Sequence, residues 1–112
     1  MASNGSARKR YIVVTLRAFR DGRDYVSECV ELQTASQGDS LEEAIDMARD
    51  AAEVYVEGLA EVGELDRVLR ERRIKVLTAK PRSVPLRTDV QPGDLVQVVV
   101  LPITVSRASA AA

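Results

Sequence analysis

The chain has 112 residues, 46% of them hydrophobic and 29% charged, with a formal net charge of −1. This length favours a single domain with a small core. Histidine is absent and cysteine occurs once, which excludes Ser-His or Cys-His catalysis and an internal disulfide.

The charges are strongly segregated along the chain. Residues 1–27 carry a net charge of +4, residues 28–66 carry −11, and residues 67–112 carry +6. Such segregation can create opposed surface patches that steer association. Alternatively, the three segments neutralise one another within the fold or within a dimer, and the sequence leaves both possibilities open.

The first half of the domain is expected to be a β-meander. Residues 1–9 are polar and basic and are interpreted as a disordered lead-in. Residues 11–19 alternate as a half-buried strand does, and the Asp21-Gly22 pair that follows is typical of a tight hairpin turn. Residues 25–32 are predicted to be the returning strand, and residues 33–38 a third, short strand.

An amphipathic helix is predicted to follow. Ser40 is its expected N-cap, and Glu43 stands three residues later, as a capping box requires. The apolar positions are spaced three and four residues apart and form one face: Leu41, Ala44, Ile45, Ala48, Ala52, Tyr55, Val56 and Leu59. Acidic residues line the opposite side, and Gly63 interrupts the helix.

The second half is less regular. Residues 64–73 are predicted to form a shorter helix, with Leu65, Val68 and Leu69 directed inward, and residues 74–79 a short strand. Residues 80–94 hold three of the four prolines and are expected to be loop. Residues 95–105 form the most β-prone stretch, typical of a central or interface strand, in which Pro102 marks a bend or an edge. We therefore predict one domain over residues 10–105, followed by a flexible tail at 106–112.

Chemistry-bearing motifs are scarce, so we expect no enzyme, no cofactor and no metal site. The lone Cys29 lies in a predicted strand and is better explained as a small apolar side chain than as a nucleophile. Two basic segments remain weak candidates for contacting nucleic-acid phosphates, which require positive charge alone. Their residues are Arg8, Lys9, Arg10, Arg70, Arg72 and Arg73.

The segment CVELQTASQGDSLEEAI, residues 29–45, resembles the HicB-like family. That family has a tyrosine-rich second strand, a Cys-Pro-Asp/Glu-Leu step, a Ser-Gln-Gly-Asp-Ser/Thr loop and a helix that opens with Glu-Glu-Ala. The resemblance covers roughly residues 11–63, and Val30 stands where the family usually has proline.

The resemblance implies an α+β fold of β-β-β-α-β order, a partial ribonuclease H-like sheet that lacks the nuclease acids, with one main helix packed on one face. It further implies an antitoxin that binds and neutralises HicA, a small mRNA-cleaving toxin, and that self-associates as a dimer or tetramer. Many such antitoxins carry a C-terminal DNA-binding module. After Arg73 this chain offers only strand and proline-loop patterns.

Three functions therefore stay open: an antitoxin-type binder, an orphan homo-oligomer without a toxin, and a weak nucleic-acid binder. For the first, the acidic side of the helix would complement a basic toxin, although solvation alone also explains such a stripe. The candidate partner-binding residues are Glu43, Asp46, Asp50, Glu53 and Glu57. The polar N-terminus lacks the apolar run of a signal peptide, and the single cysteine suits a reducing compartment, so we expect a cytoplasmic protein.

Overall fold

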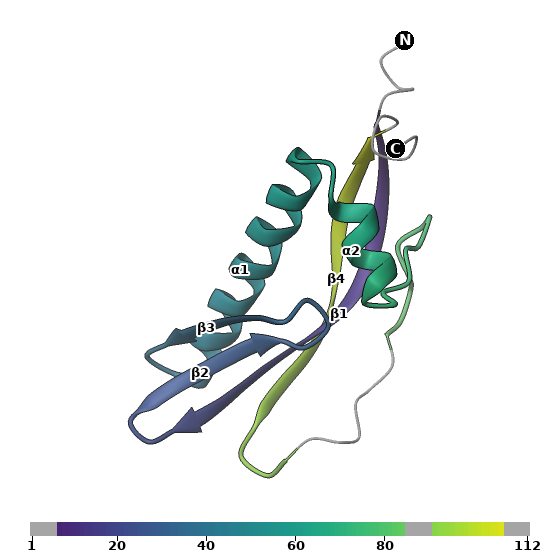
Figure 1. The fold of residues 1–112 in the computed structure, drawn as a ribbon. Coiled ribbons are helices and arrows are strands. Elements are labelled where there is room, and N and C mark those ends of the chain that lie inside the picture. The colour runs from purple at the N-terminus through teal and green to yellow at the C-terminus, as the bar shows by residue number, and fades with distance from the viewer. Residues whose placement is uncertain (1–6, 85–90, 107–112) are drawn as a thin grey trace.

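The computed structural model describes residues 7–84 and 91–106, and shows an α+β fold in which two helices accompany a four-stranded antiparallel sheet (Figure 1). The strand order in the sheet is β3-β2-β1-β4. The elements are β1 (Ala7–Asp21), β2 (Asp24–Cys29), β3 (Thr34–Gly38), α1 (Leu41–Glu61), α2 (Leu65–Glu71) and β4 (Leu95–Ser106). The three strands and two helices expected before residue 74 are thus confirmed as elements.

The meander begins with a tight hairpin. β1 and β2 form a hairpin whose last pair is Asp21 with Asp24, and Gly22 in the turn has a φ of 65°, which glycine adopts without strain. β1 begins at Ala7, so residues 7–9 of the expected lead-in are strand residues paired with β4. Ser106, the first residue of the predicted tail, is likewise a strand residue that ends β4. Residues 1–6 and 107–112 of the predicted lead-in and tail lie outside the described residues.

The core lies on one face of the sheet. Alternate β1 side chains, from Ile12 to Ala18, are fully buried. β4 adds Val99 and Leu101, which pair with Val14 and Ile12, and Ile103 two residues farther along. The period of two along β1 that predicted a half-buried strand therefore marks the core face correctly.

α1 packs on this core face, through five buried residues: Ala44, Ile45, Ala48, Ala52 and Val56. All five belong to the predicted apolar face, whose small alanines let the helix approach the sheet closely. At its first turn the approach is closest to β3: an ideal Cβ built on Gly38 would lie 2.6 Å from the backbone nitrogen of Ala44. Only glycine fits there without a shift of the helix.

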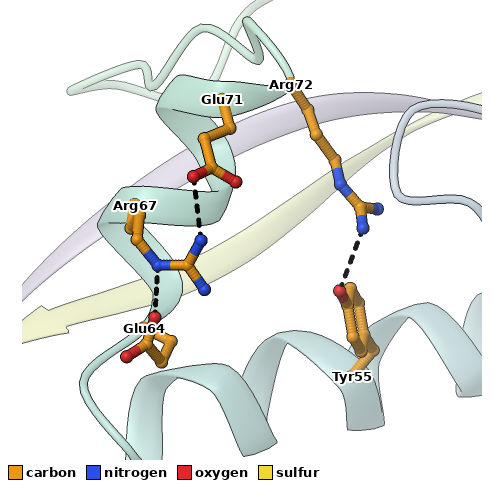
Figure 2. Close-up of polar contacts among 5 residues, drawn as sticks. All are labelled: Tyr55, Glu64, Arg67, Glu71 and Arg72. Carbon is orange, nitrogen blue, oxygen red and sulfur yellow. Dashed lines mark hydrogen bonds and ion pairs between the residues drawn. The ribbon is translucent and has the colours of Figure 1, made fainter.

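α2 joins the same core. Leu65, Val68 and Leu69 are buried, as predicted. Arg72, at the end of the helix, donates a hydrogen bond to the backbone oxygen of Leu32. It donates a second one, at 3.3 Å, to the hydroxyl of Tyr55 (Figure 2). The Arg72 guanidinium also lies 5.7 Å from the centre of the Tyr55 ring. These contacts tie α2 to α1 and to the loop after β2.

The strand expected at residues 74–79 is reduced to an isolated bridge. Leu77 and Tyr11 exchange two backbone hydrogen bonds of 2.9 and 2.8 Å, on the side of β1 that β2 occupies farther along. β2 pairs with β1 only from Leu16 onward, so the bridge lies on the part of the β1 edge that β2 leaves open, and the rest of residues 74–79 does not pair there. Residues 85–90 of the predicted loop lie outside the described residues.

The second face of the sheet carries the other alternate residues of β1 and β4. Val96, Val98 and Val100 form its β4 row, paired with Arg17, Thr15 and Val13. These valines are half-buried, and the buried core residues of the two helices do not pack on this side. None of the helices in the described ranges is long and apolar enough to cross a membrane.

Candidate functional site

The five predicted partner-binding acids are all exposed and lie along one side of α1. Their spacing of three and four residues follows the helical repeat, so their carboxylates form one continuous stripe opposite the core face. We call this set the acidic stripe: Glu43, Asp46, Asp50, Glu53 and Glu57. Whether it contacts a partner remains a prediction.

Glu43 has a structural task within the stripe. Its Oε1 accepts the backbone N–H of Asp39 at 2.6 Å, while the Ser40 hydroxyl accepts the N–H of Glu43 at 3.0 Å. The Ser40 half of the predicted capping box is therefore present, whereas Glu43 accepts from Asp39, the residue before the N-cap, and not from Ser40 itself. The other four acids are the ones free to serve a partner.

Ion pairs elsewhere show how far the segregated charges neutralise one another. Arg17 pairs with Glu28 at 2.9 Å and with Asp94 at 2.7 Å, joining all three charge segments, and these hydrogen bonds raise the pKa of Arg17. Arg67 bridges Glu64 and Glu71 along α2 (Figure 2). Within the described ranges, none of these ion pairs includes Asp46, Asp50, Glu53 or Glu57, so no basic side chain neutralises this part of the stripe.

A groove between α1 and β4 borders the stripe. Its volume is about 600 Å³. Val56, Ala60, Leu101 and Ile103 give it an apolar lining, and three glutamates of α1 add negative charge: Glu53, Glu57 and Glu61. The groove could not be predicted from the sequence, because its formation depends on which strand lies beside the C-terminal half of α1. The four-residue step from Glu57 to Glu61 was the one local signal.

The weak nucleic-acid candidates fall into two groups. Lys9 is exposed and Arg10 half-buried near the start of β1, whereas Arg70 and Arg73 are exposed around the end of α2. The bridge between Tyr11 and Leu77 is antiparallel, so the chain followed back from Leu77 to Arg73 runs away from Lys9 and Arg10. The guanidinium of Arg72 is occupied by Leu32 and Tyr55, and the side chain of Arg8 lies outside the described part. Phosphate binding stays a prediction for the remaining four.

Cys29 is buried in the core, and that burial raises the pKa of its thiol to about 11. A thiol with this pKa stays protonated near neutral pH, and the thiolate is the nucleophilic form. No group of three or more acidic or cysteine side chains that could hold a metal ion occurs among residues 7–84 and 91–106.

The chain gave no match to a protein-family model, to the curated proteins or to the solved structures. The functional argument therefore rests on the residues and on their arrangement.

Proposed function

We propose that this chain is a non-enzymatic, HicB-like antitoxin-type protein that binds a small basic toxin of the HicA type and blocks its cleavage of mRNA. The chain contacts the toxin directly and covers the toxin's basic, RNA-binding surface. The proposal places the protein in the cytoplasm, where such a toxin would act.

The acidic stripe is the observation that carries this proposal. Apart from Glu43, its four carboxylates have no ion-pair partner in the described ranges. They stand on a helix whose opposite face is buried in the core. A surface that grips RNA is rich in Lys and Arg, and charge complementarity of this kind raises association rates and fixes the orientation of a complex.

The order of elements supports the proposal further. The resemblance implies three strands, a helix and a final strand, and the chain has this order with α2 inserted before β4. The Ser-Gln-Gly-Asp-Ser segment runs from the end of β3 to the start of α1, and a Cβ on its Gly38 would lie 2.6 Å from the backbone nitrogen of Ala44. The motif thus has a structural reason within this fold.

The test is capture of the tagged protein from its own cells at moderate salt, followed by mass spectrometry. We expect a stoichiometric small basic protein that contains histidine and cleaves RNA. The double variant Asp50→Lys with Glu53→Lys should lose this protein. Asp21→Lys with Asp24→Lys reverses two exposed acids at the hairpin turn instead, and should retain it. Equal loss in both variants would argue against the stripe.

The orphan homo-oligomer is the second candidate, and the β4 row on the second sheet face favours it. Val96, Val98 and Val100 form an aliphatic strip that neither helix covers with its core residues. Recovery of the chain alone, as a stable dimer or tetramer, would support this function over that of an antitoxin.

A further inference from the structure

The groove between α1 and β4 combines two chemistries in one concave site. Val56 of α1 and Leu101 and Ile103 of β4 form its buried apolar floor, and half-buried Ala60 extends the apolar lining. Pro102 and Thr104 are the exposed β4 residues that line it. Three exposed glutamates of the same helix stand beside them: Glu53, Glu57 and Glu61. A complementary group must therefore be apolar along its length and cationic at its end, which describes the side chains of arginine and lysine.

The three glutamates are unfavourably placed for the isolated chain. They follow one another at four-residue intervals, a spacing at which like charges on a helix repel. Glu57 and Glu61 also lie in the last turns of α1, where the helix dipole disfavours negative charge, and this last turn contains no basic residue. Cations brought by a partner would relieve both repulsions.

The outer edge of β4 discourages a second copy of this chain as the occupant. Tyr11 directs its backbone groups away from β4 to Leu77, so its partner Pro102 directs its own nitrogen outward. Proline has no N–H to give at that position. Antiparallel pairing of two β4 strands places a two-fold axis perpendicular to the sheet, so both α1 helices lie on the same face of the joined sheet. Their glutamates would then approach each other.

We infer that this groove binds a basic segment of a different polypeptide, with Arg or Lys stems on Val56, Ala60 and Ile103 and their charges at Glu53, Glu57 and Glu61. This goes beyond the proposed function, because it names a surface and a chemistry that hold whether or not the partner is a toxin. It also separates the groove from Asp46 and Asp50, which do not line it.

The experiment titrates isotope-labelled protein with the capped hexapeptide Arg-Leu-Arg-Leu-Arg-Leu and follows backbone amide shifts by NMR at about 0.15 M salt. Binding should shift the amides of Val56, Ala60, Leu101 and Ile103 most. The matched peptide with Glu in place of Arg should shift none of them. Shifts spread evenly over all exposed acids, or no binding tighter than about 1 mM, would overturn the inference.

Two double variants locate the charge. Glu57→Gln with Glu61→Gln should weaken peptide binding about three- to tenfold, the loss expected for two partly exposed ion pairs. Asp46→Asn with Asp50→Asn removes the same charge from the same helix outside the groove, and should change affinity by less than about twofold at this salt. Equal weakening by both pairs would overturn the inference. Failure to find a toxin in cells would leave these results unchanged, so the two proposals fail separately.

Discussion

At the scale of single residues, Glu31 completes the edge of β1 where β2 turns away. Its Oε1 accepts the backbone N–H of Thr15 at 2.6 Å, and its Oε2 accepts the Thr15 hydroxyl at 2.8 Å. Glu31→Ala removes both acceptors from a residue that is 5% exposed, so we expect a loss of about 1–3 kcal/mol in urea unfolding. Glu31→Gln keeps one acceptor oxygen and should lose less. Equal stability of the wild type and both variants would refute this role.

Cys29 gives a prediction about pH. Its pKa is about 11 in the folded chain and near 9 in the unfolded one, because burial disfavours the thiolate. The folded state therefore holds the proton more tightly, and this contribution is complete below pH 9 and is lost as the pH rises to 11. Between pH 8 and pH 11 the melting temperature should fall more steeply for the wild type than for Cys29→Ala. Parallel curves would contradict the prediction.

At the scale of elements, the contact between β3 and the start of α1 is the most sensitive. Gly38→Ala places a Cβ against the backbone of Ala44 and Glu43, so the helix must shift, at an expected cost of about 1–3 kcal/mol. Gly58→Ala is the matched control, because Gly58 is exposed within α1 and has nothing within 4 Å of a Cβ. It should stabilise by about 0.5–1 kcal/mol. Urea unfolding measures the change in the free energy of unfolding for both variants. If both variants were stabilised, or both destabilised, the account would be contradicted.

Elements governed by local pattern could be predicted from the sequence, whereas those governed by distant pairing could not. The period along β1, the Ser40 N-cap and the apolar face of α1 are all set within a few residues. The strand predicted at residues 74–79 is wrong, because a strand requires pairing along its length and this segment meets β1 only at the pair Tyr11 and Leu77. The acidic stripe was predictable from helical spacing, but the groove required knowing that β4 pairs with β1 beside α1.

At the scale of the whole molecule, the two sheet faces have different roles. The core face is closed by α1 and α2, while the second face presents the β4 row of Val96, Val98 and Val100. If the chain self-associates, we expect this row rather than the outer edge of β4 to mediate it. Val98→Lys should then shift the species seen in sedimentation-velocity runs toward monomer, and Gln97→Lys, exposed on the opposite face of the same strand, should not. An oligomer that survives Val98→Lys would contradict this assignment.

The central claim is neutralisation of a basic toxin through the acidic side of α1. The most direct measurement titrates this chain into an RNA-cleavage assay of the small basic protein captured with it. We predict that cleavage falls to background at a fixed stoichiometric ratio, and that Asp50→Lys with Glu53→Lys leaves it active. Capture of the chain without such a protein, or cleavage that persists at saturating wild-type chain, would contradict the account.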